Sequence, residues 1–122
     1  MRTPKRILER RRSVRIDENL LFRIDHEDYE AEVRTLNISR SGALCLVDRN
    51  IPLMTRLKIG LTVPLANSSA RVKEHTIRLK GVVVRKEEDK VTGKFYMAVY
   101  FSDISPDDQR FLQDYIDRRL KK

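Results

Sequence analysis

The sequence predicts an all-β domain with one C-terminal helix, in which about six short antiparallel strands close into a small barrel. Short apolar segments recur along the chain and turn residues separate them, as is typical of barrels that leave no open sheet edge. A clear helical period appears near the C-terminal end. Strands and helices do not alternate, which argues against a dinucleotide-binding βαβ fold. A length of 122 residues fits one domain.

Alternating apolar residues define the expected strands. Positions 57, 59, 61 and 63 are apolar and polar or small residues lie between them, which predicts a half-buried strand. Between residues 30 and 39 the pattern changes phase from Thr35 to Leu36, which predicts a β-bulge or a bend. Gly81 lies within a long segment and indicates a bend or a close backbone approach. The expected strands are 20–24, 30–39, 42–47, 56–63, 73–87 and 95–101.

A helix is expected over about residues 105–121. Ser105 is a suitable N-cap, Pro106 suits the first helical position, and two aspartates follow in the first turn. Apolar residues recur at helical spacing and predict one face that packs on the barrel. They are Phe111, Leu112, Tyr115, Ile116 and Leu120.

Positive charge is concentrated at the N-terminus. The net charge is +8, and the first 15 residues contain seven Lys or Arg and one acid, Glu9. Residues 1–19 are therefore interpreted as a flexible basic arm, and residues 20–122 as the barrel domain with its helix. Such an arm suits an anionic partner, and charge alone leaves open a solvated tail, nonspecific nucleic-acid binding or a phosphate clamp.

Catalysis has little support in the sequence. His26 and His75 stand apart from any metal-ligand spacing, and no phosphate-binding loop or nucleophile motif is present. Cys45 lies in an apolar run and is expected to be a small buried residue. We expect no enzymatic activity, no metal and no cofactor. The absence of a signal peptide and of a long apolar segment predicts a cytoplasmic protein without membrane insertion.

Two short motifs carry the functional information. Arg11 and Arg15 form an R-x-x-x-R spacing on the arm, and Asn37, Ser39 and Gly42 form N-x-S-x-x-G between two expected strands. Each motif alone is weak, because arginine runs are usually solvated and the second motif resembles an ordinary turn. Their combination in this order, about 20 residues apart, is specific.

The paired motifs resemble the signature of the PilZ domain family. The resemblance extends to the strand residues 81–85 and to residues 97–101 with the helix after them, whereas residues 64–73 are less typical. It implies a bacterial receptor on a six-stranded antiparallel barrel of the split-barrel type. It also implies cyclic di-GMP as the ligand and an unidentified effector protein as the partner. Implied outputs include motility, biofilm formation, chemotaxis and virulence.

The resemblance assigns the ligand contacts to the motif residues Arg11, Arg15, Asn37, Ser39 and Gly42. Neighbouring residues are expected as secondary contacts, namely Arg10, Arg12, Arg40 and Ser41. Arg10, which precedes the first motif, favours an intercalated ligand dimer. The assignment makes chemical sense, because the fork of an arginine matches O6 and N7 of guanine and also pairs with phosphate. We expect the ligand to join the arm to the barrel and thereby order the arm, which would change a partner-binding surface.

Two other functions remain open at this stage. A nucleic-acid-binding barrel would explain the net charge and the outward tyrosines Tyr96 and Tyr100, which could stack on bases, but it leaves the second motif unexplained. We therefore regard nucleic acid as the less favoured ligand. A second alternative is a ligand-free protein adaptor of the same fold, which the intact motifs disfavour.

Overall fold

The computed structural model describes residues 14–65 and 73–121, which form six strands and one helix. The strands match the expected segments to within two residues at each boundary and confirm the predicted fold class. Their bounds are β1 Leu21–His26, β2 Tyr29–Ser39, β3 Gly42–Val47, β4 Arg56–Pro64, β5 Glu74–Glu88 and β6 Phe95–Asp103. The helix, α2, comprises Pro106–Leu120.

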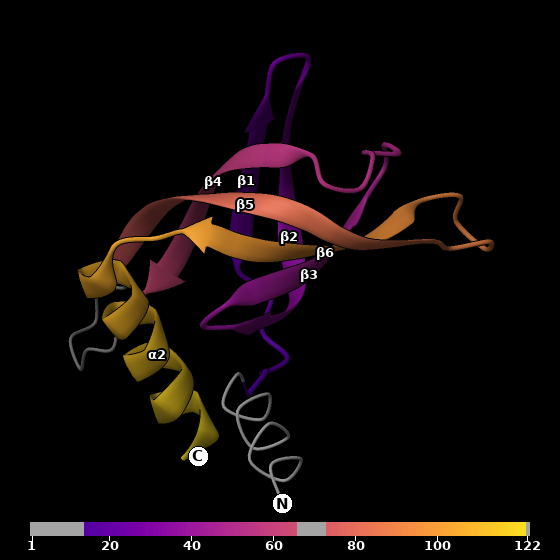
Figure 1. The fold of residues 1–122 in the computed structure, drawn as a ribbon. Coiled ribbons are helices and arrows are strands. Elements are labelled where there is room, and N and C mark those ends of the chain that lie inside the picture. Colours follow the sequence, from indigo (N-terminus) through magenta and orange to yellow (C-terminus); the bar gives the residue numbers. More distant parts are fainter. Residues whose placement is uncertain (1–13, 66–72, 122) are drawn as a thin grey trace, which may run out of the picture.

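The six strands form a closed barrel in the order β1-β2-β3-β6-β5-β4, with every neighbouring pair antiparallel (Figure 1). The ring closes between β1 and β4, where Phe22 pairs with Leu61 and Ile24 pairs with Ile59. In this ring β3 and β4 lie on opposite sides. Ligands on those two walls would therefore occupy different faces of the molecule.

Inward-facing residues of all six strands fill the barrel. The alternation predicted for residues 57–63 is observed, and Leu61 and Val63 are fully buried. Gly81 is the close approach that its position suggested, since a Cβ there would lie 2.5 Å from Cγ1 of Val99 and 2.8 Å from Cδ1 of Ile59. The expected bulge in β2 is also present, because its register with β3 shifts between Thr35 and Asn37.

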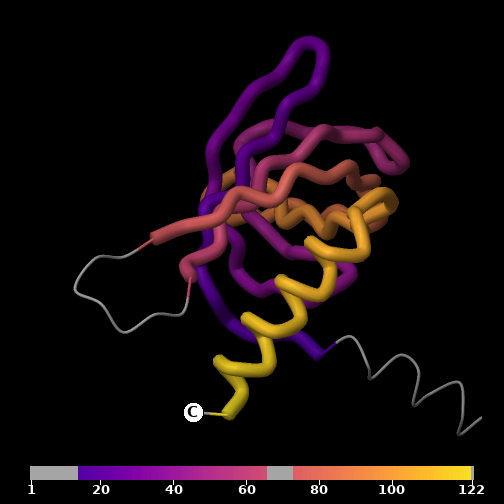
Figure 2. The backbone as a smooth tube through the Cα atoms, turned by 90° about the vertical axis from the view of Figure 1, so that its left-hand side faces the viewer, coloured from indigo at the N-terminus to yellow at the C-terminus, as the bar shows by residue number. Residues whose placement is uncertain are grey.

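Helix α2 lies across the end of the barrel where β5 begins and β6 ends (Figures 1 and 2). The N-cap prediction is confirmed, as the Ser105 side chain accepts a hydrogen bond from the backbone N–H of Asp108 at 3.1 Å. The helix buries Leu112, Tyr115 and Ile116. Leu120 is half exposed, so its assignment to the packed face was wrong. It belongs to the last turn, where the helix has passed the barrel. No helix in the described part of the chain is long and apolar enough to span a bilayer.

Residues 14–19, which were expected to belong to the flexible arm, contact the barrel. Ile16 exchanges two backbone hydrogen bonds with Ile38 of β2, at 2.9 and 3.0 Å, and its side chain is buried. Glu18 accepts hydrogen bonds from the side chains of Tyr115 at 3.2 Å and Arg119 at 2.9 Å on α2. The ordered contacts of the barrel therefore begin before residue 20.

Candidate functional site

The second motif occupies the turn between β2 and β3, at the barrel end that also carries α2. Ser39 is the last residue of β2 and Gly42 the first of β3, and they pair with each other. The carbonyl of Ser41 accepts a hydrogen bond from the backbone N–H of Phe101 at 2.8 Å. This bond fixes the turn to β6, so the motif lies on a rigid part of the sheet.

Arg15 and Asn37 join the two motifs directly. Nη1 of Arg15 donates a hydrogen bond to Oδ1 of Asn37 at 2.8 Å. The bridge between Ile16 and Ile38 holds the two backbones together one residue further along each segment. Residues 22 positions apart therefore meet at one point on the outer surface of the barrel.

Ser39 has a different environment from the one expected for a ligand contact. Its side chain is fully buried, and its Oγ accepts a hydrogen bond from the backbone N–H of Ser41 at 3.2 Å. The same oxygen lies 3.3 Å from Oγ of Ser41 and donates to the carbonyl of Gly42 at 3.4 Å. In this structure Ser39 therefore stabilises the turn, as the turn interpretation of the motif requires.

Gly42 is explained by strand packing. A Cβ at this position would lie 2.5 Å from the backbone oxygen of Val99 on β6, which is closer than real Cβ contacts allow. Of the described glycines, Gly93 has a positive φ and Gly42 does not. The motif glycine thus lets β3 and β6 approach each other, whether or not a ligand also comes close to it.

The outer face beside the motifs has a floor of small residues. Cross-strand pairing places Asn37, Leu44, Ala98 and Arg85 in one row across four strands. In the next row the same strands contribute Ser39, Gly42, Tyr100 and Val82. Because Gly42 and Ala98 have no side chain or a small one, the middle of this face is a shallow depression. Tyr100, a residue that is 52% exposed, lies beside Gly42 and offers an aromatic surface.

Arg85 gives the site a second cation. Burial, together with the positive charge of Arg85, lowers the pKa of Arg15 below its ordinary value. An arginine remains charged at neutral pH despite such a shift. Two arginines that repel each other across a shallow floor form a surface that an anion would stabilise.

Arg85 and Tyr100 were not among the predicted site residues. Both lie on strands remote in sequence from the motifs, and the bulges of β5 determine which of its residues reach this face. The outward phase of Tyr100 in an alternating strand is a usable signal, although it also suits a base-stacking residue of a nucleic-acid-binding barrel. Nothing local in the sequence marks Arg85 as a neighbour of Arg15.

The remaining predicted residues fall into two groups. Arg10, Arg11 and Arg12 lie outside the described residues. Arg40 and Ser41 follow Ser39 in the turn, and both are partly exposed. The described part of the predicted site therefore consists of Arg15, Asn37 of β2 and the β2–β3 turn.

Two residues with titratable side chains outside this site, His75 and Cys45, have structural environments. Nε2 of His75 lies 3.4 Å from Oδ1 of Asp108, and the His75 ring packs edge-on against Phe111, so this histidine connects β5 to α2. Cys45 is buried, and burial raises the pKa of its thiol to about 12. Within residues 14–65 and 73–121, no group of three or more His, Cys, Asp or Glu is arranged to hold a metal ion.

Comparison with protein families gives one match. The family model for the PilZ domain matches residues 9–118, which is most of the chain and includes both motifs. No curated protein matches the chain.

Solved structures share the fold. The inhibitor of motility MotI/DgrA of Bacillus subtilis is 27% identical, with a TM-score of 0.74 over 92% of this chain and 52% of that chain. YcgR of Escherichia coli, solved in complex with c-di-GMP, is 18% identical, with a TM-score of 0.68 over 92% of this chain and 46% of that chain. The PilZ domain of YcgR with c-di-GMP is 19% identical, with a TM-score of 0.60 over 92% of both chains. The chain spans about half the length of MotI/DgrA and of full YcgR.

Proposed function

This chain belongs to the PilZ domain family, and on that premise we propose that it is a non-enzymatic receptor for cyclic di-GMP. The observation that carries the proposal is the hydrogen bond between Arg15 and Asn37, which unites the two motifs on one outer face of the barrel. The structures of YcgR that share this fold contain c-di-GMP. Their low identity supports the fold, so the ligand assignment rests on the motif residues of this chain.

The chemistry of the face suits a guanine dinucleotide. Arg15 can present its fork to O6 and N7 of a guanine or to a phosphate, and Arg85 supplies a second positive charge. The Tyr100 ring offers a stacking surface for a base. The low floor at Gly42 and Ala98 lets a flat ligand lie against the sheet. We assign these roles to Arg85 and Tyr100 in addition to the motif residues.

The rest of the first motif would complete the site from the arm. Arg11 is proposed to contact the same ligand, and Arg10, Arg12, Arg40 and Ser41 to make secondary contacts. A second, intercalated ligand molecule would place more phosphate against this arginine-rich segment. Isothermal titration of the full chain tests both points. We expect saturable heat with cyclic di-GMP at two ligands per chain, and little with GMP, GTP or cyclic di-AMP.

Because residues 14–19 already contact the barrel, we further propose that ligand binding orders the rest of the expected arm, residues 1–13, against it. The basis is the location of the motifs, one on a basic segment and the other on a fixed strand junction. Hydrogen–deuterium exchange should show protection of residues 1–13 at saturating cyclic di-GMP. Unchanged exchange under those conditions would exclude this switch while leaving the binding site intact.

A nucleic-acid function is the second candidate, because Tyr96 and Tyr100 are exposed on the same strand of a chain with a net charge of +8. Binding to a polyanion would weaken steeply with salt, since each neutralised phosphate releases counterions. Binding of one dinucleotide should depend less on salt. Affinities for cyclic di-GMP and for a ten-residue oligothymidine at about 50 and 200 mM NaCl therefore separate the two functions.

A further inference from the structure

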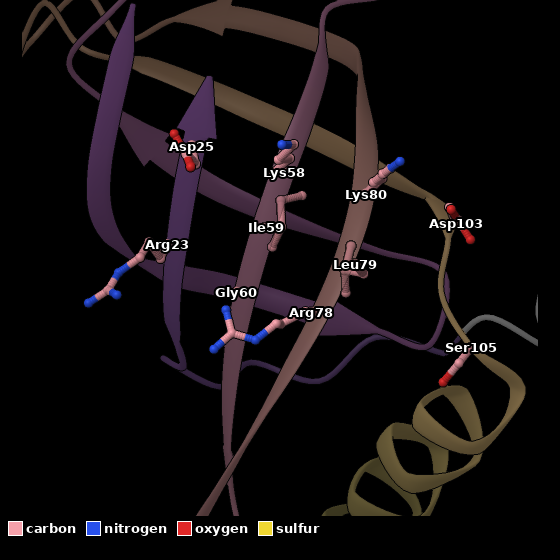
Figure 3. A pocket seen from close by; sticks show the side chains of 10 residues that line it. All are labelled: Arg23, Asp25, Lys58, Ile59, Gly60, Arg78, Leu79, Lys80, Asp103 and Ser105. Atoms are coloured by element: carbon pink, nitrogen blue, oxygen red, sulfur yellow. The ribbon is translucent and has the colours of Figure 1, made fainter. Parts of the chain in front are cut away.

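The outer face of β1, β4 and β5 contains a hollow that the PilZ motifs do not touch. Its volume is about 490 Å³ (Figure 3). The side chains that define it are Arg23 and Asp25 of β1, Lys58 of β4, and Arg78 and Lys80 of β5. Asp103 and Ser105, at the start of the connection to α2, complete one edge. We call this hollow the basic groove.

Gly60 forms the floor of the basic groove. Cross-strand pairing places Gly60 between Arg23 on β1 and Arg78 on β5, so the two arginines stand two strand spacings, or about 10 Å, apart. Figure 3 shows the Arg78 side chain extending from β5 across β4 at Gly60. A Cβ at this glycine would find Cγ2 of Thr76 at 3.7 Å and Cβ of Arg23 at 3.8 Å, which are ordinary contacts. The barrel therefore does not require a glycine here, and its effect is to leave room between the arginines.

The basic groove has an excess of positive charge, since four cationic side chains and two aspartates line it. Arg23 forms an ion pair with Glu32 on β2. Among the described residues, the side chains of Lys58, Arg78 and Lys80 make no hydrogen bond or ion pair, and the one side-chain contact of Lys80 is made by its backbone carbonyl, which accepts from Ser102 Oγ at 3.4 Å. In the next row, Asp25 pairs in register with Lys58, which pairs in turn with Lys80. A carboxylate above Gly60 would thus meet free cationic side chains on two strands.

Acidic side chains border the same cations. Asp25 and Asp103 line the basic groove, and Glu30 and Glu32 line a second hollow that shares Arg23 and Arg78 with it. A uniform polyanion such as nucleic acid would be repelled along these borders. A protein segment can place carboxylates at the centre and neutral or basic residues at the edges. We propose that the basic groove docks an acidic, extended segment of a partner protein.

The basic groove and the motif site lie on different walls of the barrel. The groove is centred on β4, which is opposite β3 in the ring. Both sites can therefore be occupied at once, and acidic-segment docking does not require a nucleotide. The docking proposal rests on the proposed receptor function in one respect only, namely the idea that cyclic di-GMP binding regulates the docking.

The test uses the full chain and a defined probe, a fluorescein-labelled decapeptide with glutamates at its centre and glutamines at both ends. We expect saturable fluorescence anisotropy with a dissociation constant below about 1 mM. Amide chemical shifts should move in residues 21–26, 56–64 and 74–82. Arg78→Glu should weaken binding at least about tenfold. Gly60→Val should do the same without a change of charge, because it fills the floor. Lys90→Glu, an equal charge change in the β5–β6 turn, should alter affinity less than about twofold.

Absence of binding, or shifts outside these strands, would overturn the proposal. An oligothymidine of ten nucleotides that binds tighter and moves the same amides would also overturn it, in favour of nucleic acid. Circular dichroism of each variant checks folding, so that lost binding reflects the groove. A parallel titration with cyclic di-GMP separates the two hypotheses. If the chain binds the peptide but not cyclic di-GMP, only the receptor function is contradicted. If it binds cyclic di-GMP but not the peptide, only the docking proposal is contradicted.

Discussion

Arg15 makes the contact that unites the motifs, so its removal is the sharpest test at the residue scale. A hydrogen bond to a charged group contributes about 1.5–3 kcal/mol when its loss leaves the partner unsatisfied. Arg15→Ala should therefore weaken cyclic di-GMP binding by roughly ten- to a hundredfold in calorimetric titration. Lys121→Ala, which removes a cation beyond the end of α2, should leave the affinity nearly unchanged. A wild-type affinity in Arg15→Ala would take this residue out of the site.

Gly42 requires a different test, because a substitution there is expected to destabilise the barrel whether or not the residue contacts the ligand. The added Cβ of Gly42→Ala would lie 2.5 Å from the Val99 carbonyl, and both atoms are fixed by the β3–β6 ladder. We expect a loss of about 1–3 kcal/mol in the free energy of unfolding, as in overpacked cores. Gly60→Ala is the matched control, since its Cβ fits and the strand gains a better residue.

Urea denaturation of the two glycine variants gives the comparison. Equal stability of Gly42→Ala and Gly60→Ala would show that the strands can separate enough to accept the methyl group. If Gly42→Ala is destabilised, a loss of nucleotide binding in this variant is not evidence for a ligand contact. The glycine of the second motif would then serve barrel packing, whether or not it also serves recognition.

Individual site residues differed in how far the sequence predicted them. Arg15 and Asn37 were predicted from the paired motifs, and the structure places them in contact. Ser39 was expected to face a ligand, but it caps its own turn. Arg85 was missed because its proximity to Arg15 depends on the register of four strands and on a bulge in β5. Local sequence does not contain that register.

At the scale of elements, the segment before β1 and helix α2 act as one unit. Glu18 accepts hydrogen bonds from both Tyr115 and Arg119, and thus ties the chain that follows the first motif to the helix. Burial, and then the charge and hydrogen bond of Glu18, raise the pKa of Tyr115 to about 12. A displacement of the segment before β1 would therefore also act on α2 through Glu18.

Glu18→Gln tests this connection. The variant keeps the shape of the side chain and removes its charge, so we expect a loss of about 1 kcal/mol in unfolding free energy. The pKa of Tyr115 should fall, because a negative neighbour no longer disfavours the phenolate. Ultraviolet titration of the tyrosines, compared with the wild type, measures this shift. An unchanged titration curve would mean that Glu18 and Tyr115 are not in contact in solution.

Elements were easier to predict than their contacts. The bulge in β2 followed from a phase change in the apolar pattern, and α2 followed from its capping residues. The end of the packed helical face could not be predicted from the apolar pattern. Leu120 continues the helical period, but it lies beyond the part of the helix that packs on the barrel. The attachment of Ile16 to β2 was also missed. A single bridge of two hydrogen bonds has no periodic signal.

At the scale of the whole molecule, barrel closure separates a motif face on β2, β3, β6 and β5 from a basic groove centred on β4. The sequence indicated a barrel, because short strands without βαβ alternation leave few other ways to cover sheet edges. It did not indicate that β1 pairs with β4. That pairing joins segments more than 30 residues apart and brings Arg23 beside Gly60. The groove therefore depends on the closed topology, and no short sequence motif predicts it.

The stability of the closed barrel should fall at alkaline pH through its buried thiol. Cys45 is fully buried, and its pKa is raised to about 12, whereas an unfolded cysteine titrates near 8.5. Between these values the unfolded chain has lost the thiol proton and the folded chain retains it, so rising pH favours unfolding by about 1.4 kcal/mol per unit. The stabilisation is complete below pH 8.5 and is lost as the pH rises towards 12.

Urea denaturation under reducing conditions at about pH 8.5 and 10.5 measures this effect. Between these two values the wild type should lose about 2 kcal/mol more than Cys45→Ala, which has no thiol to ionise. The variant begins from a lower stability because it leaves a small cavity, so the comparison concerns slopes and not absolute values. Parallel pH profiles for the two proteins would mean that the thiol reaches water in the folded state. The wall between β3 and β6 would then be open where the structure shows it closed.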